Sequence, residues 1–140
     1  MKKPPPDIPV VVVHDRTQAE AAVRHAETLN CPLNILYSAT LALAGGPTMA
    51  RVMVPDSGPD SILHVLDCGP DPGCAWRAID AGWSHITVDE TGASLTRTIK
   101  SLALQKHVTV WQTSQFMKGR TVLNLDGCPD PSAVLTRGLG

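Results

Sequence analysis

The residues best placed to do chemistry lie where a short apolar segment ends in a sharp turn. Asp67 and Cys68 come directly after the apolar residues 62–66. A carboxyl group beside a thiol could act as an acid–base or nucleophilic pair. In the alternative interpretation, Asp67 hydrogen-bonds the turn and Cys68 is a small buried side chain. The sequence therefore predicts Asp67 and Cys68 as candidate catalytic residues, with that alternative left open.

Four further polar residues, His14, Ser38, Asp89 and Thr113, each follow an apolar segment with strand character. The carboxyl ends of parallel strands meet at one edge of a sheet, where α/β proteins usually place their sites. We therefore expect these side chains to line one rim together with Asp67 and to bind a small ligand there. The alternative is that polar residues at strand ends only satisfy turns.

The stretch 61–89 shows most clearly the elements that would position these residues. An apolar run at 62–66 is broken by a turn, and Asp71 then precedes Pro72, a pairing typical of a helix start. Gly82 suits the left-handed conformation that ends many helices. Residues 86–88 begin another strand. The stretch thus predicts a strand–helix–strand unit with Asp67 at the carboxyl end of its first strand.

The rest of the chain repeats this unit. We expect strands at 8–13, 33–37, 62–66, 86–88, 108–111 and 121–125. Helices are expected from a capping box at 17–20 through residue 29, from 72 to 81, from about 94 to 106, and after Pro131. Residues 45–47 are read as a break, 49–54 as a helical turn or short strand, and 114–120 as a polar connection. The echo of residues 66–72 at 125–131 is interpreted as shared turn chemistry, with a duplicated functional loop as the alternative.

Repeated strand–helix units require a parallel sheet with right-handed crossovers. The expected fold is α/β, with five or six strands in chain order forming part of a TIM-like barrel. An open, doubly wound flavodoxin-like sheet is the alternative, and periodicity does not separate the two. Residues 1–7 are expected to form a flexible proline-rich tail, and 8–140 a single α/β domain.

Composition excludes several classes of partner. The formal net charge is −1, from 12 basic and 13 acidic side chains without a basic stripe, so a nucleic-acid partner is not expected. No apolar run approaches the roughly 20 residues that span a bilayer. The start of the chain lacks the apolar stretch of a signal peptide, so we expect a cytoplasmic protein. Its four cysteines lack zinc-ribbon spacing and are expected to be reduced.

From Gln18 to Thr113 the chain resembles the first part of the class II fructose-bisphosphate aldolase family. Residues 18–38, QAEAAVRHAETLNCPLNILYS, are similar to that family's helix and second strand. Residues 61–69 resemble its strand ending in Asp-His-Gly, and 77–83 resemble its Ile-x-Ala-Gly-Phe helix end. Residues 86–89 are similar to its next strand, which ends in Ile-Asp-Gly. The resemblance implies the front part of a (β/α)8 barrel.

Carried over residue by residue, the resemblance implies that the family's zinc site is incomplete. Asp67 matches the catalytic Asp that handles a substrate hydroxyl proton. Cys68 stands where the family has a zinc-binding His, and Thr113 where it has a Glu associated with the metal. The family's later His-bearing strands have no counterpart before Gly140. A catalytic zinc site needs about three protein ligands, so we expect neither a metal nor another cofactor.

These expectations lead to three functional hypotheses. The favoured one is a non-catalytic, aldolase-like domain that binds a small molecule or partner and forms a homodimer, because an incomplete barrel leaves open strand edges. The second is an enzyme, a carbon–carbon lyase or an isomerase, that uses Asp67. The third is a flavodoxin-like regulatory domain whose similarity to aldolases is generic.

Overall fold

A computed structural model describes residues 8–56, 58–89 and 93–139, without the side chains of 93–96. The expected tail at 1–7 lies outside the described residues. The strands are β1 (Val10–Val13), β2 (Leu33–Tyr37), β3 (Ile62–Asp67), β4 (His85–Val88), β5 (Thr109–Gln112) and β6 (Val122–Asn124). The helices are α1 (Arg16–Leu29), α2 (Ala39–Val52), α3 (Pro72–Asp80), α4 (Ala93–Lys106), α5 (Thr113–Met117) and α6 (Pro131–Leu139).

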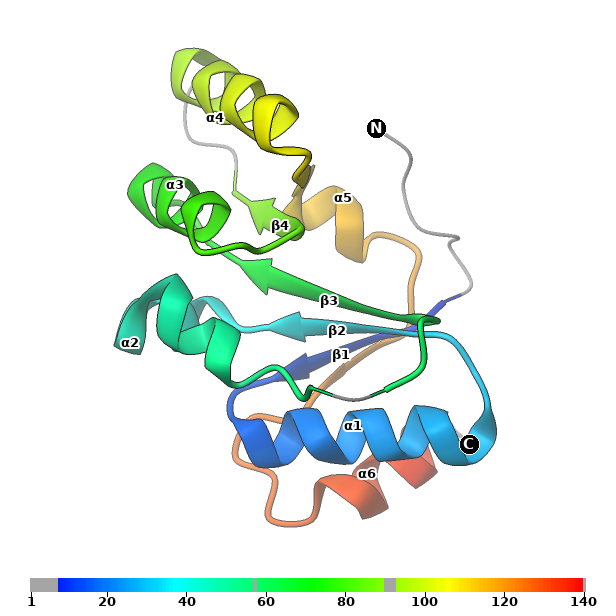
Figure 1. Ribbon diagram of the computed structural model, residues 1–140. Helices are drawn as coiled ribbons and strands as arrows, with labels where there is room; N and C mark the ends of the chain where they lie inside the picture. Colours follow the sequence, from blue (N-terminus) through cyan, green and yellow to red (C-terminus); the bar gives the residue numbers. More distant parts are fainter. Residues whose placement is uncertain (1–7, 57, 90–92, 140) are drawn as a thin grey trace.

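All six strands lie in one parallel sheet with the order β5-β4-β3-β2-β1-β6 (Figure 1). The first five are adjacent in chain order, as expected for part of a barrel. Residues 8–139 therefore form an α/β fold of six strands and alternating helices. The flavodoxin-like alternative is wrong, because that order places β1 between β2 and β3. The expected place of the sixth strand is also wrong, because β6 pairs with β1 and not with β5.

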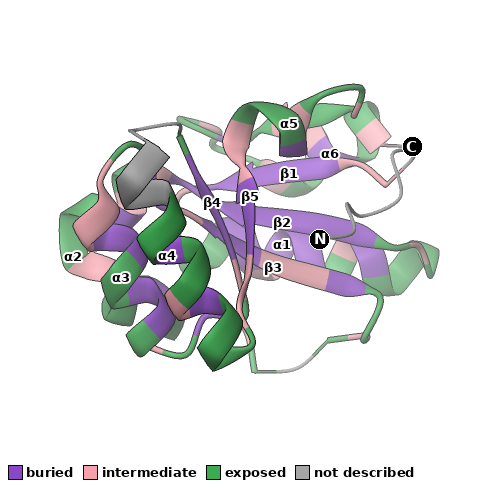
Figure 2. Cartoon of the chain, turned by 90° about the horizontal axis from the view of Figure 1, so that it is seen from above, coloured by how far each residue is buried: buried purple, intermediate pink, exposed green. Residues whose placement is uncertain are grey.

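The helices divide unequally between the two faces of the sheet. One face carries the larger core, in which α1, α2, α3, α4 and α6 pack on alternate strand residues such as Val11, Ile35 and Ile86. The other face carries a smaller core of Val10, Val12, Leu36, Val65, Trp111 and the α5 residue Phe116. Figure 2 shows β1 and β2 buried between these layers, whereas part of β3 is only half-buried. Helices that connect adjacent strands on one face are the arrangement of a singly wound barrel.

Backbone and side-chain hydrogen bonds fix β6 beside β1. The amide of Val10 donates to the carbonyl of Thr121 over 2.8 Å, and the amide of Leu125 donates to the carbonyl of Val12 over 3.0 Å. The buried Gln18 side chain also donates from Nε2 to the Leu125 carbonyl over 2.7 Å. The two backbone bonds pair the N–H of Val10 and the carbonyl of Val12 with the neighbouring strand, so these buried groups of β1 are not left without partners.

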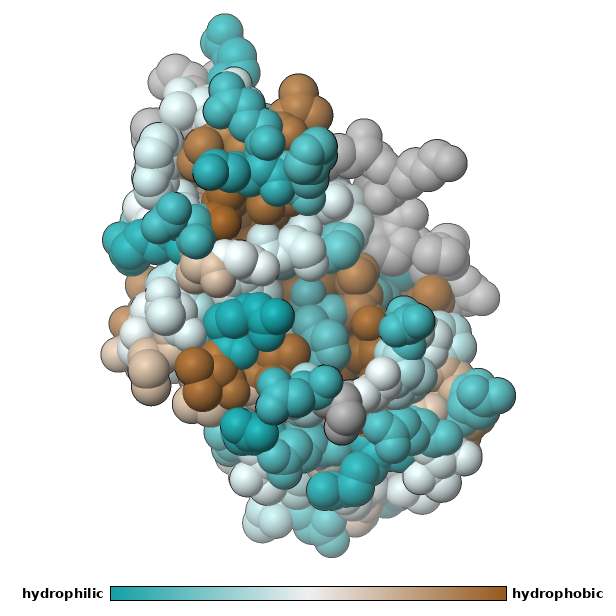
Figure 3. Space-filling view, in the orientation of Figure 1, coloured by the Kyte–Doolittle hydropathy of each residue, from teal (hydrophilic) through white to brown (hydrophobic). Residues whose placement is uncertain are grey.

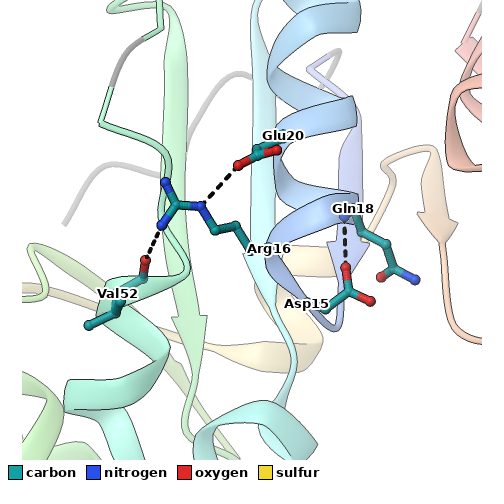
Figure 4. Close-up of polar contacts among 5 residues, drawn as sticks. All are labelled: Asp15, Arg16, Gln18, Glu20 and Val52. Atoms are coloured by element: carbon teal, nitrogen blue, oxygen red, sulfur yellow. Dashed lines mark hydrogen bonds and ion pairs between the residues drawn. The ribbon is translucent and has the colours of Figure 1, made fainter.

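The α1 cap differs from the expected one. The side chain of Asp15, in extended backbone, accepts a hydrogen bond of 2.8 Å from the amide of Gln18 (Figure 4). Helix α1 consequently begins at Arg16, and the expected capping box at 17–20 is wrong. Glu20 instead accepts a hydrogen bond of 2.9 Å from Arg16 Nε on the helix surface, where such pairs contribute little to stability.

Helix α2 contains the break that was expected at residues 45–47. The helix runs from Ala39 to Val52, but Gly46 has φ +83° and ψ 165°, a conformation essentially restricted to glycine. Pro47 follows this kink and is buried. The kink divides α2 into two short segments, so the helix does not cover β2 and β3 along their full length (Figure 1).

The region expected to be a polar connection contains helix α5. Its Phe116 is fully buried and stacks on Trp111, with ring centroids 5.3 Å apart. The guanidinium of Arg120 covers the same ring from 5.3 Å and donates from Nε to the Phe116 carbonyl over 2.7 Å. One aromatic residue among polar neighbours gave too little helical periodicity to identify this element from sequence. In the described residues no helix has the length and apolarity that crossing a bilayer requires.

Candidate functional site

The carboxyl group of Asp67 is the meeting point of three strand ends. Its Oδ1 accepts a hydrogen bond of 2.9 Å from the Gly69 amide. The hydroxyl of Thr87, on β4, donates to the same oxygen over 3.3 Å, and the hydroxyl of Thr113, at the start of α5, over 3.4 Å. The register places Asp67 opposite Thr87. Asp67 and Thr113, both expected at the rim, are therefore brought together.

The position of Asp67 raises the pKa of its carboxyl group. Burial raises the pKa of the Asp67 carboxyl, the Gly69 amide opposes this increase, and the negative charge of Asp89 adds to it. The two threonine hydroxyls again favour the charged form. Functional sites frequently contain a half-buried carboxyl group whose pKa is raised, as is that of Asp67 at the end of β3.

Cys68 does not share the surroundings of Asp67. Its side chain is 1% exposed and packs in the larger core, next to the buried Cys74 of α3. The hydrogen bond with the Cys74 thiol, together with burial, raises the pKa of Cys68. The thiolate, which is the nucleophile and the metal ligand, is therefore disfavoured at Cys68. The two predicted catalytic residues lie next to each other in sequence but do not form a pair in space.

The other predicted rim residues have different surroundings. His14 is hydrogen-bonded through Nε2 to Oδ1 of Asn124 on β6, over 2.7 Å. Ser38 is buried, and its hydroxyl accepts a hydrogen bond of 3.2 Å from the Leu41 amide, so it caps α2. The structure thus places Ser38 inside the helix cap and His14 on the β1–β6 side of the rim.

Asp89 lies at the exposed end of β4. Its amide donates to the Gly69 carbonyl over 2.9 Å, which joins the turn after β3 to the end of β4. Between them lies a narrow apolar cleft of about 10 Å³, lined in part by Pro70, Val88 and Ile99. This volume holds about one water molecule.

The residues present do not fit the zinc ion that the aldolase resemblance implies. Cys68 points into the core, and the Thr113 hydroxyl donates to Asp67. Across 8–56, 58–89 and 93–139, no three His, Cys, Asp or Glu side chains gather as a metal-binding group. Because a catalytic zinc needs about three protein ligands, we derive no step through a metal at this rim.

Two rim residues were missed from the sequence. Thr87 is fully buried yet polar, and it stands between Ile86 and Val88, whose side chains face the helices. A lone threonine in an apolar strand beside Asp67 was the available signal. Asn124 was not identified because β6 was expected at the other edge of the sheet.

Comparisons with known proteins relate the fold of this chain to that of solved structures. The chain matches no described family profile, and no curated protein sequence is significantly similar to it. Its fold is similar to that of a candidate fructose-1,6-bisphosphate aldolase from Coccidioides immitis, with a TM-score of 0.62 and 22% identity. The likeness covers 74% of this chain and 44% of that structure, so the chain spans less than half of its length. The aldolase-like fold expected from the sequence is confirmed, and membership of class II remains a prediction.

Proposed function

We propose that this chain is an aldolase-related α/β domain that binds a small hydroxylated molecule at the Asp67 rim without a metal ion. The observation that carries the proposal is the convergence of Thr87 and Thr113 on Asp67 from adjacent strand ends. A carboxyl group held in place by two hydroxyls is a suitable partner for the hydroxyls of a sugar or a hydroxy-carbonyl compound. The nearby charge of Asp89 argues against a phosphate group at this position.

Burial of Asp67 supports a ligand-binding role over a purely structural one. An asparagine side chain at this position could accept the hydrogen bond from the Gly69 amide equally well. It carries no charge, so its burial would cost less free energy. A carboxyl group whose pKa is raised by burial destabilises the folded state at neutral pH relative to such a neutral group. This cost is expected where the carboxylate contacts a ligand.

Calorimetric titration with fructose, in the presence of a chelator, tests the proposal. Because hydrogen bonds to a charged group contribute about 1.5–3 kcal/mol, Asp67→Asn should weaken binding about tenfold or more. The control Asp126→Asn changes a carboxylate in an exposed turn and should leave the affinity unchanged. Equal affinity of Asp67→Asn and the original chain would contradict a site at Asp67.

A carbon–carbon lyase is the second candidate, favoured by the raised pKa of Asp67. A general base is most effective when its pKa lies near the working pH. In such a cleavage Asp67 would take the hydroxyl proton, and the electron pair of the broken carbon–carbon bond would remain on an enediolate. That anion needs a positive partner, whereas the identified neighbours of Asp67 are two threonines and Asp89. We therefore rank binding above cleavage.

A further inference from the structure

The helix-covered face of the sheet contains a hollow that is separate from the Asp67 rim. Arg51 of α2, beyond the kink at Gly46, lies beside this hollow, and Figure 3 shows the surface hollowed above α1. One part has a volume of about 180 Å³ and is lined by Arg51, His64, Trp83 and Ser84, among others. An adjoining part of about 380 Å³ shares Arg51 and His64.

His64 forms the floor of this hollow, in a position that an apolar residue would normally occupy. Residues Ile35 and Leu66, which neighbour it on the same face of the sheet, are fully buried. Its Nδ1 lies 2.9 Å from the hydroxyl of the fully buried Tyr37. Burial, and to a smaller extent the charge of Arg51, lowers the pKa of His64 to about 4, so the ring is neutral near pH 7.

The contact with Tyr37 determines which ring nitrogen of His64 carries the proton. Burial raises the pKa of Tyr37, so its hydroxyl keeps its proton. If this hydroxyl accepted from Nδ1–H, its own hydrogen would be buried without a partner, which is costly. The hydroxyl must therefore donate to Nδ1, and the proton of the neutral ring lies on Nε2. Among the described residues Nε2 has no hydrogen-bond partner, so it offers a donor to the hollow.

Arg51 adds a positive charge beside the same hollow. Its guanidinium lies 5.9 Å from the centre of the Trp83 ring. That ring is buried, donates from Nε1 to the Pro47 carbonyl over 2.9 Å, and meets Tyr37 edge-on at 5.4 Å. The kinked segment of α2 is thus fixed to the ring over which Arg51 lies, and a cation over a Trp face is a favourable arrangement.

We infer that the 180 Å³ part of the hollow binds the anionic group of a small molecule, a phosphate or a carboxylate, between Arg51 and Nε2–H of His64. Its lining residues include no acidic side chain. The adjoining 380 Å³ part is lined also by Asp56 and Asp60, so it suits an uncharged or positively charged remainder of the same molecule. This inference does not depend on the proposed function, because Asp67 lies on the opposite face of the sheet.

NMR titration of the ¹⁵N-labelled full chain at pH 7 tests the site, with inorganic phosphate and acetate as separate probes. The Trp83 indole N–H signal should shift in a saturable manner with at least one probe, and the tighter probe identifies the anionic group. Arg51→Gln should raise the Kd about tenfold or more, as expected when a charge-assisted contact is lost. The matched control Arg137→Gln, on α6, should leave the Kd unchanged.

The His64 tautomer provides a second measurement that needs no change in affinity. Long-range ¹H–¹⁵N spectra of the original chain should show the Nε2–H form, and Tyr37→Phe should reduce its proportion because Tyr37 positions the ring. A predominant Nδ1–H form would overturn the inference. So would the absence of saturable shifts with both probes, or an unchanged Kd in Arg51→Gln.

Discussion

His64 makes the stability of the fold depend on pH. In the unfolded chain this side chain is protonated below about pH 6.5, whereas in the folded state its pKa is lowered to about 4. Between these values the unfolded state binds more protons, so the free energy of unfolding decreases as the pH falls. With allowance for partial exposure, we expect His64 to account for a loss of about 2 kcal/mol between pH 7 and pH 4.

Urea unfolding of the original chain and of His64→Gln at several pH values measures this contribution. Glutamine keeps a hydrogen-bonding group near Tyr37 but does not titrate. The difference in unfolding free energy between the two proteins should therefore shrink by about 2 kcal/mol from pH 7 to pH 4. Arg51, Asp56 and Asp60 face the same hollow and are present in both proteins, so the difference isolates His64. A pH-independent difference would show that His64 titrates normally when folded.

Single residues at the rim were only partly predictable from sequence. Asp67 and Thr113 were identified because each follows an apolar segment, and parallel strands bring such residues to one edge. The orientation of Cys68 could not be predicted, since the side chain of a residue just beyond a strand can turn to either face of the sheet. His64 and Arg51 were not identified as a site either, because their approach depends on the kink at Gly46.

At the scale of elements, α5 is the helix on which the smaller core depends. We expect Phe116→Ala to lower the free energy of unfolding by about 3–5 kcal/mol, because it leaves a cavity between Trp111 and Arg120. Leu104→Ala, on the exposed surface of α4, is the matched control and should change it by less than about 0.5 kcal/mol. Denaturant unfolding of both variants measures the difference. Similar stabilities would mean that α5 does not cover this face.

Most elements followed from local signals, whereas the place of β6 did not. Asp71 before Pro72 indicated the start of α3, and the same pairing at Asp130 and Pro131 indicated α6. Both aspartates do cap their helices, by accepting from the amides two or three residues ahead. The pairing of β6 with β1 depends on contacts between residues more than 100 positions apart, such as Gln18 and Leu125. The periodicity of apolar residues is a local pattern and does not predict such contacts.

At the scale of the whole molecule, the sheet of the described residues ends in two strands, β5 and β6, each with a neighbour on one side. Val122 of β6 is 41% exposed, and an open edge with an apolar residue can pair with another chain. We therefore expect the chain to form a homodimer through β6. Light scattering should give the mass of a dimer, and Val122→Lys should shift it toward that of the monomer.

The control for this experiment is Leu104→Lys, which introduces the same charge on the exposed surface of α4. It should leave the mass unchanged. A compact monomer of the original chain at high concentration would contradict self-association, and equal effects of the two lysines would contradict the β6 edge as its location.

The central claim is that the Asp67 rim binds a hydroxylated ligand without a metal ion. NMR mapping of fructose binding in the presence of a chelator tests this claim most directly. Fructose lacks the phosphate groups that the Arg51 hollow would bind. The account predicts saturable shifts at the amides of Thr87, Thr113 and Asp89, and none at the Trp83 indole. Shifts confined to other parts of the chain, or rim shifts that appear only when zinc replaces the chelator, would contradict it.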